Sequence, residues 1–215
     1  MRDVLATYEV HNNDNDAPCR LEIVSGPTSE QVSFVSREWV PRLLAAHERA
    51  LLAFRTLPEE ERSDAAWEIE KGRFGCQDYD WDWQRKSRDQ SGTILVLQSG
   101  VEVEALVQTS LNETSRIKES YGQPIVYIEY VATAPWNRRE IQPKPRFFGL
   151  GKLMIGVAVN ISQNEGMDGR CGLHSLPQVE GFYTHLGMQD LGIDEKEGLK
   201  YFEFSSENAK KLVEA

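Results

Sequence analysis

The residues best suited to bind an anion lie in the segment Arg146–Lys152, which reads RFFGLGK. It follows the apolar run 125–132 and opens a stretch in which apolar side chains recur at three- and four-residue spacing, as in a helix. Glycines at a helix start let the backbone approach a ligand, and the free amides of the first turn attract anions, typically phosphate. The spacing matches neither the Walker pattern nor Gly-x-Gly-x-x-Gly. We expect either a phosphate loop or a helix start with two turn glycines.

Basic side chains gather in the loop just before this segment. Residues 135–145 are rich in proline and include Arg138, Arg139 and Lys144, and Arg146 follows them. The chain has a net charge of −10, so a local group of cations is informative. The cluster is either a solvated loop or an attraction for the phosphates of a nucleotide.

Acidic and aromatic residues alternate in a third segment, 78–83, which reads DYDWDW. One interpretation is a loop that packs its rings against the protein and turns its acids to water. The other is a pocket wall for a cationic amine, with Trp81, Asp82 and Trp83 supplying ring faces and a carboxylate.

Length and composition limit the classes of protein. The chain has 215 residues and 40 % hydrophobic content, as expected for one globular domain. No basic block offsets the negative charge, so we expect no nucleic-acid partner. The three cysteines show no metal spacing and no disulfide framework, which predicts a cytoplasmic protein without a metal. No run is long enough to span a membrane, so no membrane association is expected.

The elements that position these residues can be read from periodicity and turn residues. A long helical pattern follows the first two strands, and Pro41 predicts a kink or a restart within it. Residues 110–124 are expected to be a polar connection. The expected strands are 4–10, 20–24, 93–98, 101–109, 125–133, 169–175, 188–192 and 199–204, and the expected helices include 151–164, 177–187 and 206–215.

Three segments in the C-terminal half resemble the Gcn5-related N-acetyltransferase (GNAT) family. Arg146-x-x-Gly149-x-Gly151 is similar to its pyrophosphate segment, Arg/Gln-x-x-Gly-x-Gly/Ala. Residues 131–135 resemble the end of its fourth strand, Leu-x-Val-x-Pro, and 182–188 resemble Phe-Tyr-x-x-x-Gly-Phe. The resemblance covers about residues 125 to 188. The family's frequent Asn before the last helix is absent, since Leu176-Pro177 falls there, and the loop before the glycines is longer.

This resemblance implies an α+β fold with a mixed, mostly antiparallel sheet. The fourth and fifth strands of the family part in a V-shaped splay, and helices cover both faces of the sheet. The chain is then a single domain, 1–215. Its hairpin and helices in 1–90 would form the substrate side, and 91–205 would form the acetyl-CoA-binding core.

The resemblance also implies acetyl-CoA as cosubstrate and assigns roles to individual residues. The main chain of Val131 and Thr133 would hydrogen-bond the pantetheine arm like an added strand. Tyr183 takes the place of the general acid that protonates the departing thiolate. The pyrophosphate would be bound by Arg146, Phe147, Phe148, Gly149, Leu150, Gly151 and Lys152.

A base must remove a proton from the substrate ammonium, directly or through water. Glu129 is the one charge in an otherwise apolar strand, and burial would raise its pKa toward neutrality. The alternative is an acid paired with a cation at the sheet surface. His174, expected on the next strand, is a second candidate base and substrate contact, or a structural histidine.

Together these features predict an N-acetyltransferase that moves acetyl from acetyl-CoA to a primary amine by direct attack in a ternary complex. Segment 78–83 favours a small cationic amine as acceptor. The alternative is a non-catalytic acyl-CoA-binding module that acts as a sensor or interaction unit. A homodimer is possible through the N-terminal hairpin.

Overall fold

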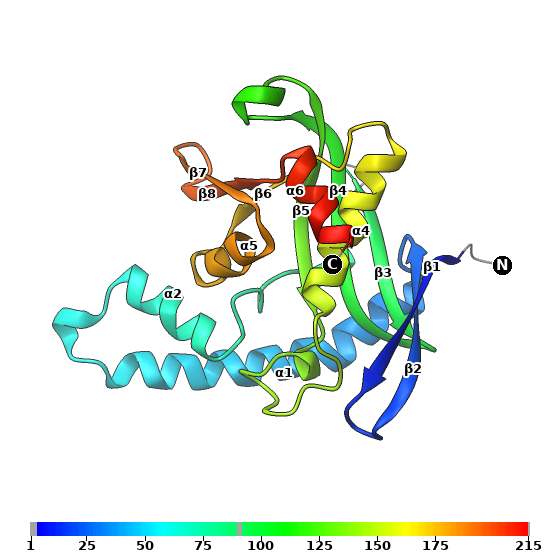
Figure 1. Ribbon diagram of the computed structural model, residues 1–215. Helices are drawn as coiled ribbons and strands as arrows, with labels where there is room; N and C mark the ends of the chain where they lie inside the picture. Colours follow the sequence, from blue (N-terminus) through cyan, green and yellow to red (C-terminus); the bar gives the residue numbers. More distant parts are fainter. Residues whose placement is uncertain (1–3, 90–91, 215) are drawn as a thin grey trace. The chain divides into compact units, whose positions relative to one another are not determined.

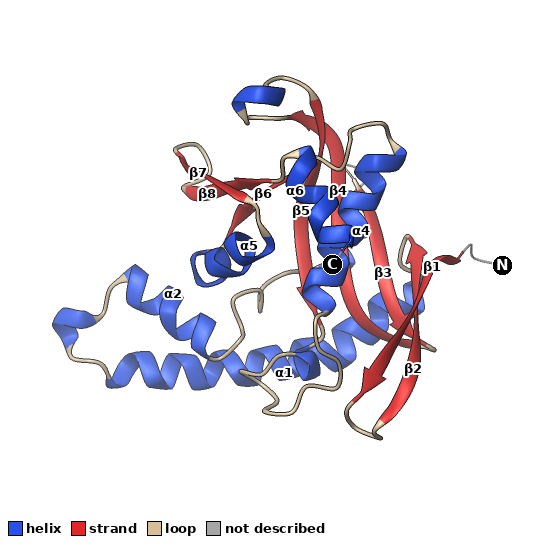
Figure 2. Cartoon of the chain, in the orientation of Figure 1, coloured by secondary structure: helices blue, strands red, loops and turns tan. Residues whose placement is uncertain are grey.

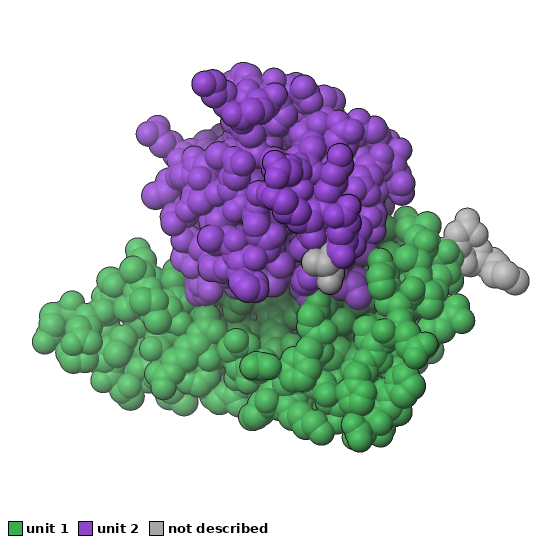
Figure 3. Space-filling view, viewed as in Figure 1, with its two compact units in different colours: residues 1–90, 94–106, 132–150 green, residues 91–93, 107–131, 151–215 purple. Residues whose placement is uncertain are grey.

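A computed structural model describes residues 4–89 and 92–214. The chain divides into two compact units, coloured separately in Figure 3. The first unit comprises 1–90, 94–106 and 132–150, and the second comprises 91–93, 107–131 and 151–215. The sequence placed a boundary at 90/91, which falls outside the described residues. The single-domain organisation stays a prediction.

The first unit contains an N-terminal hairpin, a long helix and shorter helices (Figure 1). Its elements are β1 (Val4–Asn12), β2 (Ala17–Ser25), α1 (Ser29–Thr56), α2 (Asp64–Arg73), α3 (Trp83–Lys86), β3 (Thr93–Ser99) and 3-10 helices at Glu59–Glu61 and Pro135–Asn137. Strands β1 and β2 pair antiparallel, and β2 pairs antiparallel with β3. Helix α2 folds back against α1.

Helix α1 starts with a capping box, in which Thr28 and Gln31 each accept a hydrogen bond from the other's backbone amide. It then runs without interruption through Pro41. The predicted restart at Pro41 is therefore wrong. A proline inside a helix costs about 3 kcal/mol, and the buried side chains Trp39 and Leu43 on either side of it offset this cost.

The second unit contains the C-terminal strands and the helices between them (Figure 2). Its own elements are a 3-10 helix at Lys118–Ser120, β6 (Cys171–Ser175), a 3-10 helix at Pro177–Val179, α5 (Glu180–Leu186), β7 (Gln189–Asp194), β8 (Leu199–Glu203) and α6 (Ser206–Glu214). Four elements have residues in both units, and these are β3, whose first residue Thr93 belongs to the second unit, β4 (Glu102–Thr114), β5 (Pro124–Thr133) and α4 (Leu150–Asn164).

Hydrogen-bonded strands follow the order β1-β2-β3-β4-β5-β6-β8-β7. The pair β5–β6 is parallel, whereas β6–β8 and β7–β8 are antiparallel. This confirms the predicted α+β class with a mixed, mostly antiparallel sheet. Helices on both faces stay a prediction, because the positions of the two units relative to one another are not determined.

Two local differences from the sequence reading matter for the site. Strand β4 continues to Thr114, although 110–124 was expected to be a polar connection. The hairpin beyond it is held to β8, because the Ser115 hydroxyl and the Arg116 amide both donate to the Glu203 carboxylate. In residues 4–89 and 92–214, no helix has the length and apolar character needed to cross a bilayer.

Candidate functional site

The second unit contains two parallel strands that part soon after they meet. The parallel pairing of β5 with β6 covers Val126 with Cys171 and Tyr127 with Gly172. Beyond these pairs β5 continues to Thr133, whereas β6 pairs with β8 along its other edge as far as Ser175. The predicted V-shaped splay is thus present, with its apex at Tyr127 and Gly172. Beyond the apex, the β5 edge that faced β6 has no partner strand in the pairs the structure describes, and such an edge can bond a ligand.

The two faces of the sheet around the apex differ in chemistry. Side chains alternate along a strand, so Tyr127, His174 and Tyr201 share one face, which we call the His174 face. Phe202 and its cross-strand partner Leu173 share the other, the Phe202 face. The His174 face is polar and the Phe202 face is apolar. The splay therefore separates a hydrophilic side from a hydrophobic one.

A chain of polar contacts runs across the His174 face. The Tyr127 hydroxyl lies 2.6 Å from His174 Nδ1, and His174 Nε2 lies 3.1 Å from Asp194 Oδ2. Arg116 donates to the same oxygen at 2.6 Å and stacks its guanidinium 4.0 Å from the Tyr201 ring. Hydrogen bonds from Arg116 and His174 hold the pKa of Asp194 well below its usual range. Both ring nitrogens of His174 are therefore engaged, and its side chain is only 9 % exposed.

Glu129 lies two residues beyond the apex, on the His174 face of β5. Its Oε1 accepts a hydrogen bond from the Ser110 hydroxyl of β4 at 2.9 Å, and its side chain is half-buried. Its charge raises the pKa of Tyr127, after the larger effect of burial. Glu129 is thus an ionisable group at the arm of the splay, as its proposed role as base requires.

Tyr183 lies on the other side of the sheet. Helix α5 packs it against Phe202, with ring centroids 5.8 Å apart, and the neighbouring Phe182 ring is 5.2 Å away. The side chain is buried, which raises its pKa, so the phenol keeps its proton. A protonated phenol has the form that a general acid needs.

Helix α4 begins at the glycine segment, as the sequence predicted. Gly149 has φ +76°, a left-handed conformation that other residues avoid, and it is exposed. In the second unit, a Cβ atom on Gly151 would lie 3.3 Å from the Phe182 ring, so this glycine lets α4 pack closely against α5. Lys152 is exposed in the first turn. Gly151 is thus next to the residue that precedes Tyr183.

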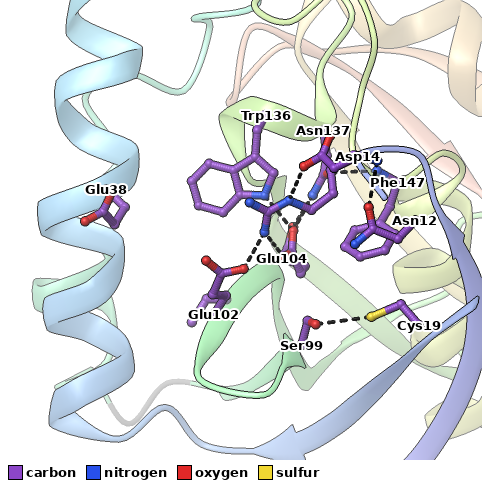
Figure 4. A network of polar contacts seen from close by, with 12 residues as sticks. Asn12, Asp14, Cys19, Glu38, Ser99, Glu102, Glu104, Trp136, Asn137 and Phe147 are labelled. Atoms are coloured by element: carbon purple, nitrogen blue, oxygen red, sulfur yellow. Dashed lines mark hydrogen bonds and ion pairs between the residues drawn. The ribbon is translucent and has the colours of Figure 1, made fainter. Parts of the chain in front are cut away.

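The side chain of Arg146 is held by acids of the first unit, and Figure 4 labels three of them, Asp14, Glu102 and Glu104. Its guanidinium pairs with Asp14 at 3.0 Å, with Glu104 at 3.0 Å and with Glu102, and it stacks over Trp136. Its carbonyl accepts from the Asn13 amide. These contacts tie the tip of the β1–β2 hairpin to the loop, and they give Arg146 a structural role that the sequence did not predict.

The other loop residues also have partners in the first unit. Phe147 is buried, and its amide donates to Asn137 Oδ1 at 3.0 Å. Phe148 is 51 % exposed beneath the Arg139 guanidinium. Leu150 is buried at the start of α4. The amide of Phe147 is therefore already bonded, whereas Gly149 in the same loop is exposed.

Two of the four cations of the basic loop, Arg138 and Arg146, form ion pairs with acids of the first unit. Arg138 is buried and makes a two-pronged ion pair with Asp78, at 2.5 and 2.7 Å. It also donates to the carbonyls of Gly75 and Thr133. Thr133, expected to bind pantetheine through its main chain, thus offers a carbonyl that is already bonded. Arg138 looked like a phosphate ligand from the sequence, but the acid that pairs with it lies 60 residues away.

In segment 78–83, each of the proposed substrate residues makes contacts that serve the structure of the first unit. Asp82 caps helix α3 by accepting from the Arg85 amide at 2.9 Å. Trp83 is buried beside a small apolar cavity lined by residues of α1 and β4. Trp81 meets Trp83 edge to face, with 6.2 Å between centroids. These contacts support the packing interpretation, and the substrate role stays a prediction.

The second unit thus brings together six of the predicted residues around the splay and the start of α4. They are Glu129, Val131, Gly151, Lys152, His174 and Tyr183. Sequence reasoning missed Tyr127, Arg116 and Asp194. The two-residue spacing of Tyr127 and Glu129 on one strand could have revealed the first, but nothing local marks Arg116 or Asp194 as partners of a histidine.

Comparison with known proteins finds similarity in structure but not in sequence. No family model matches the chain, and no curated protein matches it. An acetyltransferase, PaiA of Thermoplasma acidophilum in complex with coenzyme A, has a TM-score of 0.48 and 11 % identity, covering 85 % of this chain and 97 % of its own.

Two further solved structures show the same pattern. A protein of Desulfovibrio desulfuricans assigned to the GNAT acetyltransferases has a TM-score of 0.47 and 11 % identity, covering 86 % of this chain and 99 % of its own. A variant of the AtaT toxin, bound to the C-terminus of its antitoxin AtaR and acetyl-CoA, has a TM-score of 0.46 and 16 % identity, covering 65 % and 83 %. The chain is similar in structure to GNAT acetyltransferases, and the chemistry must be argued from its own residues.

Proposed function

We propose that this chain is an N-acetyltransferase that transfers acetyl from acetyl-CoA to the primary amine of a small cationic molecule. One observation carries the proposal. The strands β5 and β6 part at Tyr127 and Gly172, and the glycine start of α4 packs against the residue before Tyr183. These features suit one elongated ligand. The strand edge can bond its amides, the helix start can bind its diphosphate, and the protonated phenol can act on its leaving group.

The order of these features fixes how the ligand would lie. The diphosphate would bind the amides of Gly149, Leu150, Gly151 and Lys152, with Lys152 adding charge. The pantetheine arm would run along β5 past Val131 toward the apex. Its thioester would then reach the splay between the two faces. The Phe147 amide is already bonded to Asn137, so we assign the diphosphate to the amides that follow it.

The two sides of the splay would divide the chemistry. An amine arriving from the His174 face attacks the thioester carbonyl, and the thiolate leaves toward the Phe202 face. There the buried Tyr183 phenol protonates it. Separate sides for nucleophile and leaving group suit direct attack in a ternary complex, with no covalent enzyme intermediate.

Charge supports a cationic acceptor. Glu129 stands on the His174 face, and the charges of Glu129, Glu197 and Glu113 all raise the pKa of Tyr127, after the larger effect of burial. The chain as a whole carries a net charge of −10. A carboxylate-lined approach raises the local concentration of an ammonium substrate. These acids are a better argument for a small diamine or polyamine as acceptor than segment 78–83, because the side chains of that segment cap a helix and pack against one another.

A second candidate is an acyl-CoA-binding module without turnover. The observation that favours it is the engagement of both ring nitrogens of His174, which leaves the half-buried Glu129 as the other candidate base. Such a module would bind the cofactor but release no thiol with any amine.

Calorimetry with coenzyme A and acetyl-CoA tests binding, and thiol release over a panel of monoamines, diamines and polyamines tests transfer. We expect binding, and turnover that favours di- and polyamines. Tyr183→Phe should lower kcat by about 10²- to 10⁴-fold and leave the Kd for coenzyme A unchanged. Heat without thiol release from any amine would favour the module, and absence of heat with both cofactors would refute both functions.

A further inference from the structure

We infer that Tyr127, His174 and Asp194 form a proton relay that takes the proton of the acceptor ammonium at the apex of the splay. This inference rests on the proposed function and names the base that the function requires. Tyr127 is the group at the apex, His174 is the proton acceptor, and Asp194 orients the imidazole.

The contacts fix the direction of the relay. Asp194 is held ionised by Arg116, so its oxygen can only accept, and His174 Nε2 must carry a proton toward it. In the neutral imidazole, Nδ1 then has a free lone pair. The Tyr127 hydroxyl, 2.6 Å away, must donate to it. Each group has one orientation that satisfies its neighbour, as in a hydroxyl–imidazole–carboxylate triad.

The position of Tyr127 gives this relay an outlet. Tyr127 belongs to the last residue pair before β5 and β6 part, so its phenol lies where the thioester would enter. A phenol oxygen has two lone pairs and one proton, so it can accept one proton while donating another. His174 itself is only 9 % exposed and has both nitrogens bonded. Tyr127 therefore extends the reach of a base that the substrate cannot touch.

Glu129 is better placed to hold the ammonium than to remove its proton. Its carboxylate is drawn toward β4 by the Ser110 hydroxyl, whereas Tyr127 points toward β6. The two residues stand on one face of β5, with Cα atoms about 6.6 Å apart from the rise of a strand. An ammonium between them could be paired by one and deprotonated through the other.

The proton count of the reaction closes with this relay. The ammonium gives a proton to the Tyr127 oxygen as the Tyr127 proton moves to His174 Nδ1, which leaves a neutral amine and an imidazolium beside Asp194. The amine nitrogen attacks the thioester carbonyl, the C–S bond breaks, and the nitrogen loses its second proton. The thiolate gains one proton from Tyr183. The second proton from nitrogen goes to water. After product release, the imidazolium passes its proton through Tyr127 to water, and the Tyr183 phenolate takes one proton back from water, so that one proton is released in all.

Other ionisable groups near His174 must be counted in any pH profile. They come from β4, β5, the β4–β5 connection, β7, the β7–β8 turn and β8, and they are Glu113, Tyr127, Glu129, Arg116, Asp194, Glu197, Tyr201 and Glu203.

The kinetic test compares pH profiles of kcat/KM for the wild type, His174→Gln, Tyr127→Phe and Glu129→Gln. The glutamine keeps hydrogen-bonding groups but cannot take a proton. We expect His174→Gln and Tyr127→Phe each to lower kcat by about 10²-fold or more and to remove the limb on which the wild-type rate rises as the base loses its proton. Glu129→Gln should raise KM for the amine and keep that limb. The exposed His185→Gln is the matched control and should behave as wild type.

A measurement of the imidazole itself does not depend on turnover. In ¹⁵N NMR of the full chain, neutral His174 should carry its proton on Nε2, and Asp194→Asn should weaken that preference. The relay is overturned if the proton resides on Nδ1, or if His174→Gln keeps the wild-type rate and pH limb while Glu129→Gln loses them. Failure of the proposed function would show differently, as absence of coenzyme A binding by the wild type.

Discussion

The buried ion pair between Asp78 and Arg138 gives the sharpest test of how the first unit is held together. The two side chains are 6 % and 9 % exposed, and the guanidinium also bonds the carbonyls of Gly75 and Thr133. Asp78→Asn keeps the shape but leaves a buried cation without its counter-charge. Breaking one partner of a buried pair costs about 3–5 kcal/mol. We expect a loss of that size in the free energy of unfolding.

Urea unfolding followed by fluorescence and by circular dichroism measures this loss, with Asp80→Asn as the matched control. Asp80 is an exposed acid in the same segment, so its change should stay within about 0.5 kcal/mol. The double variant Asp78→Leu/Arg138→Met should recover much of the stability, since apolar pairs can replace buried ion pairs. A loss below about 1 kcal/mol for Asp78→Asn, or a raised KM for the amine with unchanged stability, would refute the reasoning.

Three further predictions address other positions. Burial raises the pKa of Glu104 above 4.5, so just above that pH the folded state holds a proton that the unfolded state has lost. The free energy of unfolding should therefore fall as pH rises from 4.5. Glu104→Gln should flatten this profile when unfolding is measured across pH. Gly149→Ala should cost about 1 kcal/mol in thermal unfolding because φ is +76°, and an unchanged Tm would contradict it. Trp39→Phe removes the bond from Nε1 to the Val103 carbonyl at 3.2 Å and should cost about 1–3 kcal/mol in urea unfolding; a smaller loss would mean that water replaces the indole.

Local pattern was enough to predict the elements around the splay. The apolar run of β5 and the helical spacing after Gly151 both describe one segment at a time, and the structure confirms both. The hairpin turn at Gly100, with φ +59°, is likewise a local preference. The sequence also predicts a short helix that opens at residues 57–62, but the structure has a 3-10 helix at Glu59–Glu61 and starts α2 at Asp64. The start of α2 depends on a cap, the Ser63 hydroxyl, rather than on apolar spacing.

The candidate site was harder to predict because ion partners are distant in sequence. Arg146 looked like a phosphate ligand, but its acids Asp14 and Glu104 lie 132 and 42 residues away. His174 looked like an isolated histidine, and its partners come from two other strands. Periodicity predicts which face of a strand or helix a side chain occupies. It does not predict which side chain of a neighbouring strand lies beside it.

The parting of β5 from β6 also bears on how the protein behaves when it is purified. Beyond Tyr127, β5 is no longer paired with β6, so this part of the strand is an unpaired edge in the middle of a sheet. Unpaired edges favour strand pairing between molecules. A molecule lying along that edge would cover it. We therefore expect the cofactor-free protein to be the form that aggregates on storage or concentration, and excess coenzyme A to keep it monodisperse in dynamic light scattering.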